Sequence, residues 1–353
     1  MSTVKRLFTP VAMLLTMLCL AVPAKVRAAD RIRVGEGPFI TGGAFYVARE
    51  KGYFQKLGLE IETKTYMDGA LAVPSMLSGE LDMALMTANA SLFNSIAKGA
   101  PLVLILDRGH NRPGFAYTLV NVTQALYDDG IKSMADFAKL KGKKMGVGAL
   151  GSINQYNLAQ ALLKVALDPA KDVQWVVNVS QPDLMKMLGQ GQVDATDLAW
   201  QFGVFAEQNK WGPIVATGDQ MVPGAAIAMY SVRKEFLDKN RDVVIRFAMA
   251  YLHAAKEFNA AAQAPDQHPD VVEILAKNTA LNKPELVKAI APHWSYVNED
   301  GMPLVDSITE MQDFWSGKYF HFVEKKVPRE QLFDLSIARD AKARLEKEKP
   351  FGN

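Results

Sequence analysis

The sequence has almost no cysteine: its one example, Cys19, lies near the N-terminus of the 353-residue chain. The remainder can therefore form no disulfide, no thiolate metal site and no thiol nucleophile. The five histidines are scattered, and no H-E-x-x-H, G-x-S-x-G or Walker motif occurs. We therefore expect no catalytic residues, no bound metal and no enzyme activity.

Long apolar runs are also scarce. Only 11–22 is mostly apolar, and this length fits a signal-peptide core better than a membrane span. A basic start precedes the run, and the small-residue pattern of Val26 and Ala28 follows it. We predict a signal peptide over 1–28, cut after Ala28, and a periplasmic protein; a short membrane anchor is the alternative. A lipoprotein signal would have Gly, Ala or Ser before its cysteine, whereas Leu18 precedes Cys19. No lipid anchor is therefore expected.

Clusters of basic residues are missing from the rest of the chain. The segment 1–28 holds four basic and no acidic residues, so its removal takes the formal net charge from +2 to −2. This balance argues against a nucleic-acid partner. The remaining length exceeds one ordinary core, so we expect two lobes in a monomeric protein.

Strand and helix patterns alternate twice along the chain. The stretches 31–37, 59–66 and 81–86 read as strands with helices between them, which is the order that builds a parallel sheet. The same β-α-β-α-β order recurs over 143–199. We predict an α/β fold with lobe 1 over 29–118, lobe 2 over 119–222, and a return to lobe 1 with C-terminal helices over 223–353.

A short segment in the first half of the chain resembles one in the second half. The sequence "MLSGELDMALM" (76–86) resembles "LGQGQVDATDL" (188–198), so that Gly79 matches Gly191 and Asp82 matches Asp194. Two strand-like runs, 102–121 and 225–233, lead into and out of the second half. Two chain crossings between similar lobes form a natural hinge.

The stretch "GVGALG" (146–151) fits the G-x-G-x-x-G pattern of dinucleotide loops. Such a loop needs a first glycine at a strand end, a helix beginning near the second glycine, and an acid ending the next strand. Here Gly146 lies inside the strand-like run, a capping-box pattern begins only at Ser152, and "VQWVVNV" ends without an acid. We predict no dinucleotide and no other cofactor.

Candidate ligand contacts lie instead at the carboxyl ends of the predicted strands, where open α/β sheets bind ligands. Glycines and helix starts there present N–H groups that favour anions. Each of these residues has a structural alternative as a turn glycine, a helix cap or a core aromatic. The candidates are Phe39, Thr41, Gly42, Gly69 (after a possible cap at Asp68), Thr87, Asn89, Gly151, Ser152, Asn154 and Trp200.

Three further residues near the expected hinge, Arg108, His110 and Arg112, could pair with an anionic ligand. Charged and imidazole side chains of this kind are mostly exposed in proteins. We therefore expect at least two of the three to lie on the solvated surface.

Several motifs resemble those of one family, the nitrate/sulfonate/taurine-type solute-binding proteins, which also include binders of pyrimidine precursors of thiamine. The stretch "AFYVAREKGYFQKLGLEIE" (44–62) is similar to its first-lobe signature. "SMLSGELDMALM" and "GQVDATDLAWQF" are similar to its two later motifs, although Gln201 and Phe202 replace the Glu and Pro of its "WEP". The segments 305–315 and 332–341 resemble its C-terminal helices.

The resemblance implies a type II periplasmic-binding-protein fold and delivery of a small ligand to an ABC permease in the inner membrane. Helix-start sites suit a small organic anion such as a sulfonate, a carboxylate or nitrate. Aromatic candidates leave a pyrimidine or another aromatic compound open. A pyrimidine- or chorismate-pathway enzyme on the same fold, and a sensor that presents ligand to a membrane receptor, are the alternatives.

Overall fold

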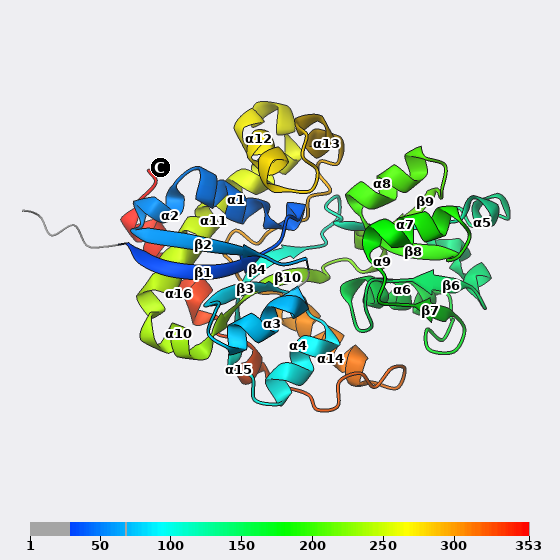
Figure 1. The fold of residues 1–353 in the computed structure, drawn as a ribbon, viewed down its shortest axis with the longest axis horizontal. Coiled ribbons are helices and arrows are strands. Elements are labelled where there is room, and N and C mark those ends of the chain that lie inside the picture. Colours follow the sequence, from blue (N-terminus) through cyan, green and yellow to red (C-terminus); the bar gives the residue numbers. More distant parts are fainter. Residues whose placement is uncertain (1–28, 68, 353) are drawn as a thin grey trace, which may run out of the picture.

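The computed structural model describes residues 29–67 and 69–352, which form two α/β lobes side by side (Figure 1). Each lobe is built on one mixed sheet of five strands. The predicted signal segment 1–28, Cys19 and the possible cap Asp68 lie outside the described residues. Within the described ranges, no helix combines the length and apolar character needed to cross a membrane.

The first lobe holds a sheet with the strand order β2-β1-β3-β10-β4. Strand β1 runs parallel to β2 and β3, while β10 runs antiparallel to β3 and β4. In chain order these strands are β1 (Asp30–Glu36), β2 (Leu59–Thr65), β3 (Met83–Met86), β4 (Leu102–His110) and β10 (Ala226–Arg233).

The second lobe repeats this arrangement with the order β7-β6-β8-β5-β9. Strand β6 runs parallel to β7 and β8, and β5 runs antiparallel to β8 and β9. Its strands are β5 (Thr118–Val122), β6 (Lys144–Gly146), β7 (Gln174–Val176), β8 (Ala195–Ala199) and β9 (Ile214–Thr217). The chain therefore passes between the sheets twice, over 111–117 and 218–225.

The two similar segments found in the sequence, 76–86 and 188–198, make the same contact in each lobe. The Asp82 carboxylate accepts a hydrogen bond from the Arg33 N–H of β1 at 3.0 Å, and the Asp194 carboxylate accepts one from the Lys144 N–H of β6 at 2.8 Å. The matched glycines, Gly79 and Gly191, have φ angles of 78° and 66°, in the left-handed region that favours glycine. The same turn therefore leads into the central strand of each sheet.

Sixteen α-helices surround the two sheets in the described part of the chain. Those of lobe 1 are α1 (Gly43–Glu50), α2 (Tyr53–Lys56), α3 (Gly69–Leu77), α4 (Ala90–Ala97), α10 (Lys234–Lys239), α11 (Arg241–Gln263), α12 (Pro269–Asn278), α13 (Pro284–Ala289), α14 (Val305–Ser316), α15 (Arg329–Leu332) and α16 (Ser336–Glu348). Those of lobe 2 are α5 (Gln124–Asp128), α6 (Ile153–Lys164), α7 (Gln181–Gly189), α8 (Trp200–Gln208) and α9 (Gly218–Met221). Short 3₁₀ turns cover Ile40–Gly42, Met134–Leu140 and Pro265–Gln267.

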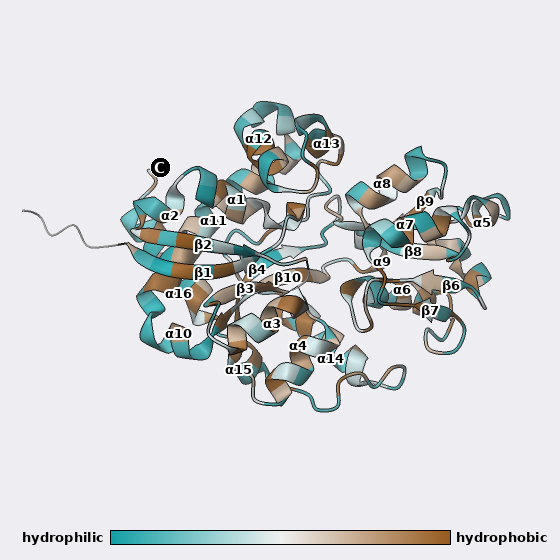
Figure 2. Cartoon of the chain, in the orientation of Figure 1, coloured by the Kyte–Doolittle hydropathy of each residue, from teal (hydrophilic) through white to brown (hydrophobic). Residues whose placement is uncertain are grey.

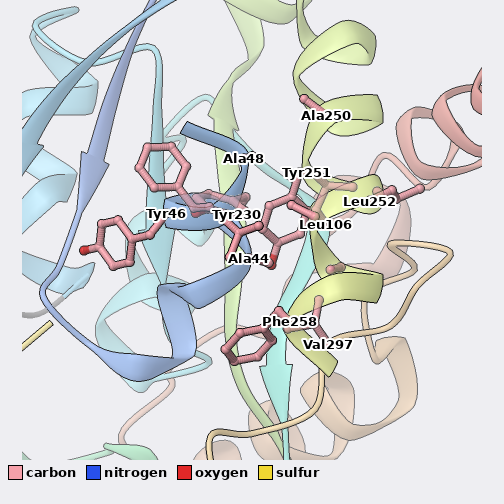
Figure 3. Packing of buried hydrophobic residues seen from close by; sticks show 14 of the residues in the cluster. Ala44, Tyr46, Ala48, Leu106, Tyr230, Ala250, Tyr251, Leu252, Phe258 and Val297 are labelled. Carbon is pink, nitrogen blue, oxygen red and sulfur yellow. The ribbon is translucent and has the colours of Figure 1, made fainter. Parts of the chain in front are cut away.

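The long helix α11 lies against α1 and α16 and covers the sheet of lobe 1 (Figure 1). Figure 2 shows the hydrophobic character of β10 and α3, two elements on the side of the lobe that approaches its neighbour. In the core beneath α11, Tyr230 of β10 meets Tyr251 with ring centroids 5.3 Å apart at 87° (Figure 3). Lobe 2 has a separate core around Phe137, Leu158 and Leu162.

Candidate functional site

A cleft lies between the two lobes. It contains a cavity of about 370 Å³ and an adjoining one of about 400 Å³, and the two share lining residues from both lobes. Lobe 1 contributes the segments after β1, β2 and β3, and lobe 2 contributes the segments after β6 and β7. These are the carboxyl ends of parallel strands, where the sheet leaves room for a ligand.

Seven of the ten candidate residues line the cavity of about 370 Å³. They come from four separate segments that the fold brings together: Phe39, Thr41, Gly69, Thr87, Asn89, Ser152 and Asn154. The other three, Gly42, Gly151 and Trp200, are not among the lining residues of either cavity. Gly42 packs against the Arg108 side chain, where an added Cβ would lie 2.7 Å from Nη2.

Two helix N-termini point into the cleft. The Asn89 side chain caps α4 by accepting from the Leu92 N–H at 2.8 Å, and Ser152 caps α6 by accepting from the Gln155 N–H at 3.3 Å. Both caps also line the cavity. The partial positive charge of both helix ends therefore faces the same space.

Three hydroxyl groups of the cleft already accept a hydrogen bond from the protein. Thr41 Oγ1 accepts from Arg108 Nη1 at 2.8 Å, and Thr87 Oγ1 accepts from Asn89 Nδ2 at 2.7 Å. The third is Ser152, the cap of α6. Because one lone pair of each oxygen is engaged, each hydroxyl proton is left to donate to a ligand oxygen. The polar part of the cleft is therefore mainly a set of donors.

Among the described residues one charged side chain, that of Arg108, lines the cleft, and its charge is compensated. The Arg108 guanidinium binds both carboxylate oxygens of Glu36, and Tyr230 also donates to this carboxylate. The side chains of Arg108 and Glu36 are 1% and 0% exposed. Burial alone would lower the pKa of Arg108, but the facing Glu36 carboxylate outweighs it, so the pKa lies well above its ordinary value. The guanidinium stays charged and its pair with Glu36 is neutral overall.

The prediction for the three hinge residues was wrong. Arg108 and His110 are both buried, and only Arg112 is exposed. His110 lies 2.9 Å from the Asp107 carboxylate, and Arg112 stacks over the Tyr296 ring at 4.4 Å. Arg108 and His110 can be buried because each has an acidic partner, Glu36 for Arg108 and Asp107 for His110. The sequence alone does not reveal these partners.

The candidate residues missed by sequence analysis are mostly apolar. Met67 and Leu71 of lobe 1 and Leu150 of lobe 2 line the cavity and are 63%, 61% and 48% exposed. Tyr117 also lines it, and burial raises its pKa to about 12. Gln181 follows β7, so the rule that selects strand ends could have found it. The sequence did not mark the apolar residues as cleft residues, because residues of the same types also form the hydrophobic core.

The "GVGALG" stretch needs one correction. Gly146 is the last residue of β6 and not interior to a strand, so its position does not argue against a dinucleotide loop. An added Cβ at Gly146 would lie 2.7 Å from Leu184 Cδ2, so close packing accounts for this glycine. Helix α6 begins at Ile153, after a cap at Ser152 as predicted. The helix start is therefore too late for the dinucleotide pattern.

Contacts between the lobes flank the cleft. Trp200 of α8 stacks on His293 of lobe 1, and the Ala90 N–H of α4 donates to the Gly151 carbonyl at 3.3 Å. Tyr156 of α6 meets Phe314 of α14 edge to face, with ring centroids 5.2 Å apart. Gly151 and Trp200 therefore serve lobe contacts in this arrangement.

Two mixed sheets with matching strand orders, joined by two crossings around a cleft, define the type II periplasmic-binding-protein fold. The chain belongs to the family described as NMT1/THI5 like, whose model matches residues 41–268. The putative binding protein YtlA of Bacillus subtilis is 24% identical over 94% of this chain and 96% of its own length.

Solved structures share the fold. The periplasmic nitrate-binding protein NrtA from Synechocystis PCC 6803 superimposes with a TM-score of 0.72 at 13% identity, over 90% of this chain and 89% of that one. The putative sulfonate ABC transporter periplasmic protein SsuA from Methylobacillus flagellatus KT gives a TM-score of 0.68 at 17% identity, over 93% and 97%. At these identities the likeness shows the fold alone.

Proposed function

We propose that this chain is an exported solute-binding protein that delivers a small organic anion to an ABC importer. Membership of the NMT1/THI5-like family and the likeness to named periplasmic binding proteins support the class. The observation that carries the ligand type is the donor set of Thr41, Thr87 and Ser152 beside two helix N-termini. Such groups match the acceptor oxygens of a sulfonate or carboxylate.

The apolar lining supports an organic body on that anion. Phe39, Met67, Leu71 and Leu150 surround the donors, and the cavity of about 370 Å³ is far larger than nitrate. Burial of a hydrocarbon or aromatic body against these side chains would contribute about 25 cal/mol per Å² of apolar surface removed from water. We therefore favour an alkyl or aryl sulfonate or carboxylate over nitrate.

A neutral aromatic ligand is the second candidate, favoured by Phe39 and Tyr117 in the cleft. An enzyme on the same fold is less well supported, because the cleft residues within 29–67 and 69–352 include no histidine, lysine or cysteine. A sensor that presents its ligand to a membrane receptor would share the same cleft. Permease and ATPase genes next to this one would separate the importer from the sensor.

The test is a thermal-shift screen of residues 29–353 against alkyl and aryl sulfonates, carboxylates, nitrate and pyrimidines, followed by calorimetry. A ligand at one hundred times its Kd stabilises the fold by ~2.7 kcal/mol. We expect organic acids with an apolar body to raise Tm, and nitrate and neutral pyrimidines to leave it unchanged. The proposal fails if no organic acid binds or if a neutral ring binds best.

Ser152→Ala supplies the site test, with Thr123→Ala as its matched control. Both residues cap a helix, since Thr123 accepts from the Leu126 N–H at the start of α5. Each variant loses a cap worth about 0.5–2 kcal/mol of stability. Only Ser152→Ala should also weaken ligand binding, and equal affinities in the two variants would remove Ser152 from the site.

A further inference from the structure

A buried carboxyl group lies directly behind the cleft. Asp197, on β8, is 1% exposed. Its main-chain carbonyl accepts from Nδ2 of Asn154, a cleft residue, at 3.2 Å. Its Oδ2 accepts from Nδ2 of Asn157 at 3.1 Å, one turn further along α6. The first turns of α6 are therefore tied to this aspartate, although its side chain does not line the cavity.

The pair of Asp197 and Asn157 has one donor too few. Asp197 Oδ1 and Asn157 Oδ1 are both buried and lack a donor with good hydrogen-bond geometry among the described residues. The Thr118 hydroxyl, whose Oγ1 accepts from Asn157 Nδ2 at 3.2 Å, has one proton to give to the carboxyl, so one of the two oxygens still lacks a donor. A carboxylic acid and a primary amide make two complementary hydrogen bonds when the acid carries its proton. A proton on Asp197 would supply the donor that the two oxygens lack. Burial also raises the pKa of Asp197 to about 7.

No positive charge compensates Asp197 in the way that Arg108 compensates Glu36. Tyr117, on the β4–β5 crossing, is an ionisable neighbour, and burial and the Asp197 charge both raise the pKa of its phenol. Within the described chain the Asp197 carboxyl forms no ion pair, and its hydrogen-bond partners are the side chains of Asn157, Thr118 and Asn154. Lys164, the cation on α6, instead donates from Nζ to the Met221 carbonyl at 2.7 Å.

We propose that Asp197 is a positioning residue of the ligand site, and that the protein binds its anion together with a proton held on this carboxyl. The neutral acid keeps Asn157 in place, beside the main-chain carbonyl that holds Asn154, without setting a negative charge behind the α6 N-terminus. An ionised Asp197 would repel an anion bound at that helix end. The inference rests on the proposed binding of an organic anion and adds the proton as a second ligand.

The test measures Kd by calorimetry between about pH 5.5 and about pH 8.5, with a sulfonate ligand because its charge does not change there. Wild-type affinity should weaken roughly thirtyfold across this range, because binding has to take up a proton once the pH exceeds the pKa of Asp197, about 7. Near the upper end, two buffers of different ionisation enthalpy should report uptake of about one proton per ligand. Asp197→Asn should bind with a Kd that does not change with pH, because the amide keeps the shape of the neutral acid.

Asp194→Asn is the matched control, because this aspartate caps the opposite end of the β6–β8 contact and should keep the wild-type pH profile. If Asp197→Asn does not fold, the infrared carbonyl band of the wild-type acid still reports its protonation with and without ligand. A pH-independent wild-type Kd, or no protonated carboxyl in the complex, overturns the proton proposal and leaves anion binding intact. Absence of binding at every pH instead overturns the proposed function.

Discussion

Trp200 and His293 stack across the two lobes, with ring centroids 3.5 Å apart and planes inclined by 14°. Trp200 begins α8 directly after a strand of lobe 2, and His293 follows α13 of lobe 1. Burial lowers the pKa of His293, so the stacked ring is neutral at neutral pH. The aromatic residue that the sequence suggested as a ligand contact therefore bridges the lobes beside the cleft.

Because Trp200 and His293 form one stacked pair, substituting either residue should have the same effect on ligand binding. Trp200→Ala and His293→Ala should each weaken ligand binding by about 0.5–1.5 kcal/mol, because each loses the same aromatic pair. The double variant should be no weaker than either single one, as a double-mutant cycle of Kd values would show. Phe205→Ala is the control, since Phe205 pairs with Trp211 inside lobe 2. A far larger loss in Trp200→Ala alone would mean that Trp200 contacts the ligand.

A second prediction concerns Gly151, which contacts the other lobe, and the stability of its alanine variant. Its φ is 68°, and an added Cβ would lie 2.7 Å from the Ala90 Cβ of the other lobe. Gly151→Ala should lower the free energy of unfolding by about 1–2 kcal/mol from backbone strain alone. Gly148→Ala has open space, with its nearest atom 3.8 Å away, and should leave the stability almost unchanged. Equal denaturant midpoints for the two variants would contradict the expected backbone strain at residue 151.

The compensated charge at Arg108 makes stability and affinity move in opposite directions. Glu36→Gln leaves a buried guanidinium without its counter-charge, which should destabilise the fold by about 3–5 kcal/mol. The same change gives the cleft a net positive charge and should tighten binding of an organic anion. Asp82→Asn, which breaks the ion pair between the buried Asp82 carboxylate and the partly exposed Arg33, should destabilise the fold without changing Kd. Weaker anion binding by Glu36→Gln would show that the pair acts as a unit.

Asp197 also predicts how stability depends on pH. Its pKa is raised from 3.8 to about 7 in the folded chain, so between these values the folded state holds more protons than the unfolded state. The contribution of Asp197 to stability is therefore fully present below its unfolded pKa and is lost as pH rises through its folded pKa. Wild type should lose up to a few kcal/mol over this window. Denaturation of Asp197→Asn should show a smaller loss, and identical slopes would contradict the burial of a neutral acid.

Much of the fold follows from local patterns. Alternating apolar residues, turn glycines and helix caps predicted the strands of both lobes, the cap at Ser152 and the repeated turn before Asp82 and Asp194. Interactions of these kinds involve neighbours in sequence, so a single chain displays them. The two strand-like runs that lead between the lobes were also visible.

Partners distant in sequence were beyond such patterns. Arg108 is buried because the sheet brings Glu36, which lies far away in sequence, against it. Trp200 stacks on His293 because the second lobe folds back to the C-terminal part of the first. Asp197 lacks a counter-charge because the side chains packed around it are amides and hydroxyls. The candidate ligand residues could be chosen from the ends of predicted strands. Their pairing, their burial and the neutral balance of charge in the cleft depend on the packing of elements from the whole chain.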